Sequence, residues 1–161
     1  MTNRMQMHSL LAAFSLAVLA SPAAHASDSR AVTINATIIG VCKFFTASPT
    51  MNINNTGTGS NIDPSLAGPA TGSALITYRC SNGTAPTFTV PATATVSCTT
   101  SGTCGSSTMT PTISHTGGGN GTGMGSGQSK TLTVTGTITQ PNYEDAPIGS
   151  YSGTMLVSIA P

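Results

Sequence analysis

Short segments in which apolar and polar residues alternate recur along this chain of 161 residues, and they constrain its fold more than any other feature. A period of two is typical of β-strands that bury one face. Turn-forming residues separate the segments, among them Ser81-Asn82-Gly83 and a glycine-rich stretch from Gly117 to Gly127. The alternating segments are 31–39, 74–80, 92–98, 132–138 and 151–159. The sequence therefore predicts an all-β protein, and short strands between such turns are typical of a β-sandwich of Greek-key type.

Charge is unusually scarce in this chain. Only 6% of the residues are charged, with 5 Lys and Arg against 4 Asp and Glu, whereas an average protein has about 25%. There is no basic surface to attract a polyanion, so we expect no nucleic-acid partner. Self-association would meet little electrostatic resistance, because Thr and Ser hydroxyls take the place of charges at the surface. This composition favours a subunit of an assembly.

The first 26 residues are typical of a secretory signal peptide. Arg4 and His8 give it a weakly basic start, an apolar run follows from Leu10 to Ala20, and Ala24-His25-Ala26 matches the small-x-small cleavage pattern. The apolar run is too short for a membrane-spanning helix, which needs roughly 20 residues. We therefore expect an exported protein whose mature chain begins near Ser27.

Export explains the four cysteines, Cys42, Cys80, Cys98 and Cys104. An even number of cysteines in an oxidising compartment predicts two disulfides, for which three pairings are possible, and the short spacing favours Cys98 with Cys104. Zinc sites usually place cysteines two to four residues apart. The spacing here fits that pattern poorly, so the sequence predicts neither a metal nor a cofactor.

No group of residues predicts catalysis. Glu144 and Asp145 are adjacent and are expected in a solvated turn, and Asp63 is expected in a loop, so no two carboxylates are expected to face each other across a cleft. His115 lacks the local sequence of a catalytic site and is expected in a surface loop. Residues 123–131 resemble a phosphate-binding loop only faintly, and we expect them to form a hairpin connection. The sequence predicts that the protein is not an enzyme.

The alternating segment from Ala31 to Ile39 has two possible roles. A strand with one apolar face needs a partner, because an exposed edge of this kind promotes aggregation. It could form the first strand of its own domain. It could instead add a strand to the sheet of a neighbouring copy, as in donor-strand complementation. Periodicity alone leaves both possibilities open.

Three stretches of the chain resemble a known family. They are residues 31–42, residues 72–83 followed by 86–90, and the tail from 132 to 161. Their order is an alternating strand before Cys42, a strand that ends in Cys80 and is followed by Gly83, and a last strand that begins Gly-x-Tyr at Gly149. In this order the chain resembles the spore coat protein U domain family, whose members include the pilins of archaic chaperone–usher pili. The resemblance implies an incomplete immunoglobulin-like β-sandwich, a disulfide between Cys42 and Cys80, and polymerisation through an N-terminal donor strand.

These observations predict a signal peptide over residues 1–26, a donor-strand segment over 27–41 and a pilin-type domain over 42–161. The donor residues would be Val32, Ile34, Ala36 and Ile38. The expected function is that of a structural subunit of a surface pilus that serves adhesion or biofilm formation. Its expected partners are other copies or related pilins, a periplasmic chaperone and an outer-membrane usher. The alternative is a secreted spore-coat-type protein or a monomeric adhesin with the same fold.

Overall fold

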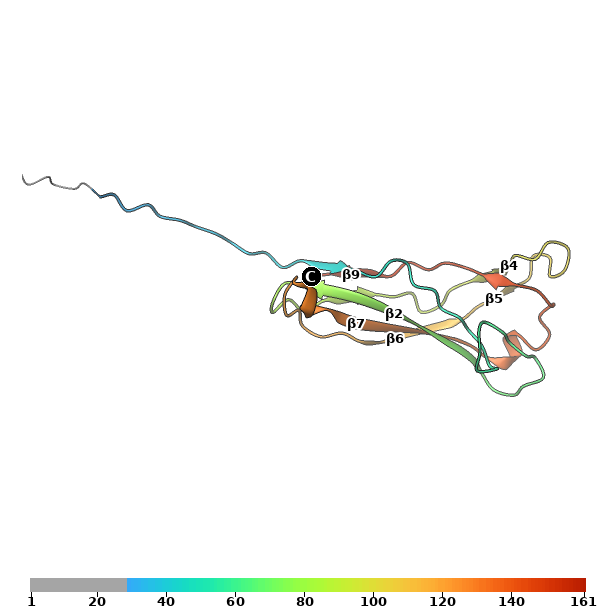
Figure 1. Cartoon of the computed structure of the whole chain (residues 1–161). Coiled ribbons are helices and arrows are strands. Elements are labelled where there is room, and N and C mark those ends of the chain that lie inside the picture. The colour runs from blue at the N-terminus through green and yellow to red at the C-terminus, as the bar shows by residue number, and fades with distance from the viewer. Residues whose placement is uncertain (1–28) are drawn as a thin grey trace, which may run out of the picture. The chain divides into compact units, whose positions relative to one another are not determined.

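The computed structural model describes residues 29–161 (Figure 1). The expected signal peptide over residues 1–26 lies outside the described residues. Residues from Thr37 to Pro161 form one compact unit, called the body below. All strands of the described chain belong to the body, and all of their pairings are antiparallel. The chain is therefore all-β in the part described, as the alternation predicts.

The elements are short, apart from two long central strands. The strands are β1 (Cys42–Phe44), β2 (Ala70–Cys80), β3 (Thr87–Thr89), β4 (Val96–Cys98), β5 (Thr108–Met109), β6 (Thr112–Gly117), β7 (Lys130–Ile138), β8 (Tyr151–Ser152) and β9 (Ser158–Ala160). Two short 3-10 helices, η1 (Ser126–Gln128) and η2 (Gln140–Asn142), precede and follow β7. The glycine-rich stretch connects β6 to β7, which pair with each other, so the predicted hairpin connection is confirmed.

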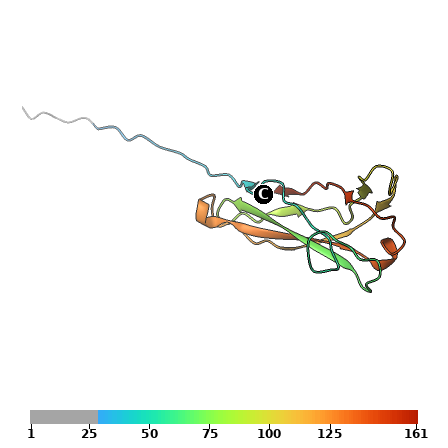
Figure 2. The same ribbon diagram turned by 45° about the vertical axis from the view of Figure 1, so that its right-hand side comes forward.

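The strands form two groups. The chain around Pro111, called the crossing segment, contacts both groups. One group is a four-stranded sheet in the order β1-β2-β7-β6, and the other contains β5-β4-β8 and the pair β3-β9. Next to Pro111, between β5 and β6, the Ile113 amide donates to the Ala92 carbonyl and the Ala94 amide donates to the Pro111 carbonyl. The chain thus passes from the second group to the first at Pro111. Figures 1 and 2 show β2, β7 and β6 side by side, with β9 and β4 on the other side of the core.

The core lies between these two groups. Ile76 and Tyr78 of β2 and Leu132 and Val134 of β7 are buried there, as the period-two pattern of both strands requires. Side chains of the opposite group pack against them, namely Phe88, Val90, Met155, Val157 and Ile159. Burial in this core raises the pKa of the Tyr78 hydroxyl.

Both disulfides join the pairs expected from the sequence. Cys42 is bonded to Cys80 across the β1–β2 pair, with their Cα atoms 4.1 Å apart, and Cys98 is bonded to Cys104, with Cα atoms 5.8 Å apart. The first disulfide ties the start of the body to the end of its longest strand. The second closes a small loop that follows β4.

Three local expectations differ from the structure. His115 does not lie in a loop: it is an exposed residue of β6, opposite Val134. The alternating segment 92–98 forms a strand only over β4, because its first part pairs with the crossing segment through an isolated bridge between Thr93 and Thr112. The last alternating segment, 151–159, is divided into β8 and β9. Residues 153–157 between them belong to no strand, although they keep an alternating burial pattern.

Tyr143 ties the end of the body beyond β7 to the loop before β2. Its ring is buried, its hydroxyl donates to the carbonyl oxygen of Gly68 at 2.5 Å, and it accepts from Nδ2 of Asn55 at 3.2 Å. Tyr143→Phe removes both of these half-buried hydrogen bonds. It should lower the free energy of unfolding of the purified chain by about 1–3 kcal/mol, measured as a lower urea midpoint.

Tyr151 supplies a matched control, since its hydroxyl donates to Pro147 in an exposed contact at 2.8 Å. Tyr151→Phe should change the midpoint much less. Equal effects of the two substitutions would show that the Tyr143 network does not hold this end together.

Candidate binding groove

A groove of about 1100 Å³ runs along the body between two stretches of chain, residues 44–53 on one side and residues 146–157 on the other. Small-molecule sites usually measure roughly 300–1,000 Å³. The side chains of the central sheet that line it are aliphatic: Ala74, Ile76, Ile113, Val134 and Ile138. The groove is thus a long apolar trough whose lining includes residues of the core.

The first wall leaves the edge of β2 and returns to it. The Phe45 amide donates to the Thr77 carbonyl at 2.9 Å, and the next backbone contact with β2 is made by Asn54, whose amide donates to the Thr71 carbonyl at 3.0 Å. Near the second contact the chain runs close to β2, and Gly72 permits this approach, because a Cβ at this position would overlap the carbonyl oxygen of Asn52.

The second wall includes β8 and the unpaired stretch between β8 and β9. Its side chains alternate, with Met155 and Val157 packed against the core and Leu156 82% exposed. This pattern is that of a strand, yet residues 153–157 take part in no sheet. Strands β1 and β9 approach each other at one end of the groove. The two walls are therefore the free edges of the two strand groups, and they converge where β1 meets β9.

The small disulfide loop holds the opposite end of the second wall. The Thr99 amide donates to the Ser150 carbonyl at 2.8 Å, and the Ser150 amide donates to Oγ1 of Thr100 at 2.9 Å. Gly149 packs so closely on this loop that a Cβ there would overlap the sulfur of Cys104. The Cys98–Cys104 loop thus fixes the chain where the second wall begins.

The N-terminal segment with the expected donor residues forms no strand within the described chain. We call residues 31–39 the arm. Its aliphatic side chains are exposed, Val32 by 80%, Ile34 by 87% and Ile38 by 93%, and Ala36 is exposed as well. In the described structure this segment is not the first strand of its own domain, because the first strand begins at Cys42. The arm is an extended segment whose aliphatic side chains are left without cover.

Nothing within residues 29–161 forms a cluster of three or more metal-ligating side chains. Asp63, Glu144 and Asp145 form no pair of facing carboxylates in the described chain. Asp63 accepts from the amide and the hydroxyl of Ser65, at 2.9 and 2.7 Å, and these hydrogen bonds lower the pKa of its carboxyl. Glu144 and Asp145 are exposed in the turn where they were expected. In the described part of the chain, no helix is long and apolar enough to cross a membrane.

The groove is suited to an extended apolar segment. It combines an aliphatic lining with a neighbouring strand-like stretch, residues 153–157, that has no sheet partner. A segment laid beside this stretch could satisfy its backbone groups and place alternate side chains in the trough. The incomplete β-sandwich implied by the family resemblance predicts such a groove, but periodicity did not show which residues line it. The signal that could have revealed it is Gly153, which interrupts the apolar positions of the last alternating segment.

Comparison with known proteins identifies no relative: no family model, no curated protein and no solved structure matches this chain.

Proposed function

We propose that this protein is an exported structural subunit of a surface fibre, and that the arm of one copy fills the groove of the next by donor-strand complementation. The fold is then an immunoglobulin-like sandwich that lacks one strand. The incoming arm supplies this strand and lies between the two walls of the groove. Val32, Ile34, Ala36 and Ile38 are the residues that enter the trough.

The observation that carries the proposal is that one chain contains both an open apolar groove and an extended apolar segment of similar length. The part of the second wall from Gly149 to Val157 has nine residues, and the arm, residues 31–39, also has nine. Either stretch spans roughly 30 Å when extended at about 3.3 Å per residue. The arm has aliphatic side chains on one face, and the groove has an aliphatic lining. The groove could bury the aliphatic side chains of the arm, and the arm could cover the aliphatic lining of the groove.

The energetics favour a stable joint. Burial of a large aliphatic side chain contributes about 1.5–3 kcal/mol, so Val32, Ile34 and Ile38 together contribute roughly 5–9 kcal/mol before ordering costs. Backbone hydrogen bonds to the unpaired stretch of the second wall would slow dissociation further. A joint of this strength suits a subunit that must remain in a fibre outside the cell.

An uncovered groove also explains the partners proposed for this protein. Apolar surface of this extent exposes an unassembled subunit to aggregation. A periplasmic chaperone would cover the groove in transit, and an outer-membrane usher would exchange the chaperone for the arm of the next copy. Adhesion or biofilm formation is the role proposed for the resulting fibre.

The size of the product tests this function. The full chain is expressed for export with and without its cognate chaperone, and the purified protein is separated by size and viewed by electron microscopy. We expect a ladder of polymers and thin fibres, with a much higher yield of subunit in the presence of the chaperone. A stable monomer that needs no chaperone and forms no ladder would contradict the proposal and favour the monomeric adhesin.

A further inference from the structure

The described chain has very few charges, and in the body they lie at opposite ends. Among residues 37–161 the cations are Lys43, Arg79 and Lys130, and the carboxylates of side chains are Asp63, Glu144 and Asp145. The strand register places each group. Lys43 lies opposite Arg79 in the β1–β2 pair, and Lys130 lies opposite Tyr78 in the β2–β7 pair. The three cations thus gather where β1 begins and β2 ends.

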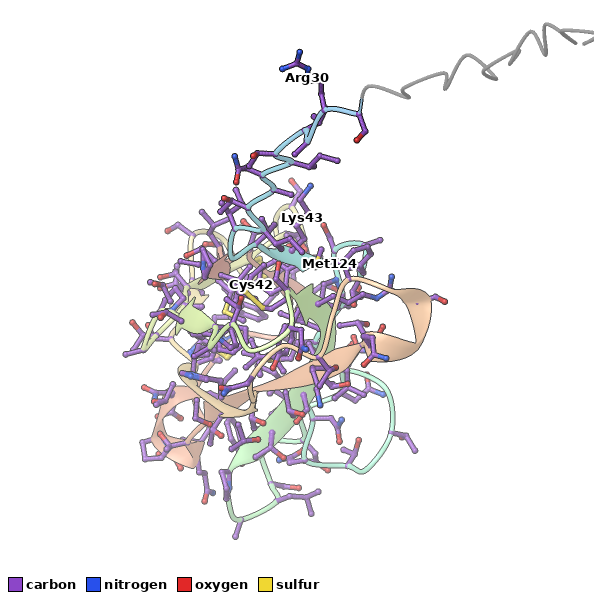
Figure 3. All side chains as sticks on the ribbon, turned by 90° about the vertical axis from the view of Figure 1, so that its left-hand side faces the viewer. Arg30, Cys42, Lys43 and Met124 are labelled. Atoms are coloured by element: carbon purple, nitrogen blue, oxygen red, sulfur yellow. A yellow bond between two sulfur atoms is a disulfide. The ribbon has the colours of Figure 1, made fainter. Side chains whose placement is uncertain are left out.

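Figure 3 looks onto the body from this cationic end and shows Lys43 beside Cys42, with Met124 nearby. Arg79 is held in place by its own contacts: Nε donates to the Ser129 hydroxyl at 3.0 Å, and its guanidinium lies 4.2 Å from the ring centre of Phe45. The arm joins the body at the same end, because only Gly40 and Val41 separate it from Cys42 in the chain. Pro161 also lies here, close to Gly40.

The acidic groups lie at the other end of β2. Asn55, which follows the bridge between Asn54 and Thr71, holds the backbone of Asp63 through two hydrogen bonds of 2.8 and 2.9 Å. The same Asn55 contacts the Tyr143 hydroxyl, and Glu144 and Asp145 come directly after Tyr143. From Thr71 to Arg79 a strand covers about 27 Å, at roughly 3.3 Å per residue. The two ends are therefore more than a Debye length of about 8–10 Å apart at physiological salt, and they do not neutralise each other.

Arg79 makes its own contacts within the fold, but the gathering of three cations at one end does not by itself stabilise the fold. Lys43 and Arg79 are like charges directly opposite each other on neighbouring strands, which is unfavourable. No salt bridge within residues 29–161 joins Lys43, Arg79 or Lys130 to an acidic side chain. Three of the few charges of this chain nevertheless lie together, which points to a partner outside the molecule.

We infer that the cationic end of one copy pairs with the acidic end of the next, so that electrostatic attraction sets the head-to-tail order of the fibre. The inference rests on the proposed function. Its occupant is a second copy of this chain, because the acidic end is the complement of the cationic end in both sign and number of side chains. The cationic end carries the root of the arm, so its docking on the acidic end brings the arm to that end of the neighbour's groove.

This pairing also fixes the direction in which the arm lies. The second wall starts near the acidic end, where Ile148 follows Asp145 closely in the chain, and runs toward β9 at the cationic end. An arm whose root is at the acidic end must run the opposite way. The arm and residues 149–157 are then antiparallel, which is the slightly more stable form of strand pairing.

Charge reversal of the ends tests the inference. Glu144→Lys with Asp145→Lys changes the side-chain charge of the acidic end from −3 to +1. Lys43→Glu with Lys130→Glu changes the cationic end from +3 to −1. Each double variant should lower the initial rate of polymerisation of the full chain at low salt by at least about tenfold, because steering by opposite charges is lost. The variant with all four substitutions has the net charge of the original chain and opposite charges at its ends, so its rate should recover.

Three comparisons make the test decisive. Ser114→Lys with Thr116→Lys adds two positive charges to exposed positions of β6, away from both ends, and should slow assembly much less. Lys43→Glu alone removes a like-charge contact within the fold, so it should fold normally and still lose part of the rate. Added salt should slow the original chain and accelerate either double variant.

An unchanged rate in the double variants would overturn the inference, as would failure of the fourfold variant to recover while it remains folded. In either case the original chain would still form polymers, and the proposed function would stand. If the original chain formed no polymer at any salt concentration, the proposed function would fall as well.

Discussion

Ile34→Asp should abolish polymerisation and leave the subunit itself intact. Ile34 is 87% exposed in the described chain, so the substitution removes no contact of the body and should not unfold it. In an assembled fibre the same position would lie in the apolar trough. An unpaired carboxylate buried there costs several kcal/mol, so the affinity between copies should fall at least about 100-fold. The measurement is the polymer ladder together with the amount of chaperone-bound subunit.

The matched control is the neighbouring residue on the opposite face of the arm. Thr33→Asp and Thr37→Asp introduce the same charge where the side chain would point to solvent, and we expect much milder losses of polymer. Normal fibres from Ile34→Asp, or equal sensitivity of both faces, would exclude donor-strand exchange through the arm. Loss of the chaperone complex as well as the polymer would mean that Ile34 serves the fold of its own subunit.

An additional copy of the arm, joined to the end of the same chain so that it can fill the groove, should raise the melting temperature strongly. A second copy of residues 29–41, joined by a short linker after Pro161, begins where β9 ends and close to Gly40. From there it can run back along the groove, antiparallel to the second wall. Burial of its three large aliphatic side chains contributes roughly 5–9 kcal/mol. The melting temperature should therefore rise by about 15 °C or more, at a few degrees per kcal/mol for a domain of this size.

The extended chain should also stop polymerising, because its groove is already filled. A control extension in which the positions of Val32, Ile34 and Ile38 are replaced by Ser should give neither effect. A groove that has nothing to do with strand addition would show the same melting temperature with both extensions.

The periodicity of the sequence predicts the strands that bury one face, but it does not show where the edge of a sheet is left without a neighbouring strand. The alternation over 74–80 and 132–138 appears as β2 and β7, because Ile76, Tyr78, Leu132 and Val134 must all point into the core. The turn after Cys80 and the glycine-rich connection from β6 to β7 were predicted for the same local reasons. These features depend on residues that are close together in the sequence.

The groove depends on the relation between two distant edges. Residues 153–157 have the alternation of a strand, but a strand also needs backbone partners, and no segment of the described chain supplies them. The pairing of Ile113 with Ala92 across the crossing segment is likewise invisible to periodicity, since Pro111 breaks the alternation between β5 and β6. The arm had the clearest alternation near the start of the chain, yet it forms no strand here. Its pattern fits a partner that lies outside its own body.

The most direct test of the central claim is to find what the arm touches in the assembled protein. A photoreactive benzoylphenylalanine is placed at position 34, in copies labelled with ¹⁵N, and these are mixed with unlabelled copies that carry Ile34. After assembly and illumination, mass spectrometry identifies the linked peptides. The account predicts links from labelled position 34 to unlabelled peptides that line the groove, such as those with Met155 or Ile76. Links confined to the labelled chain itself, or to peptides that do not line the groove, would contradict it.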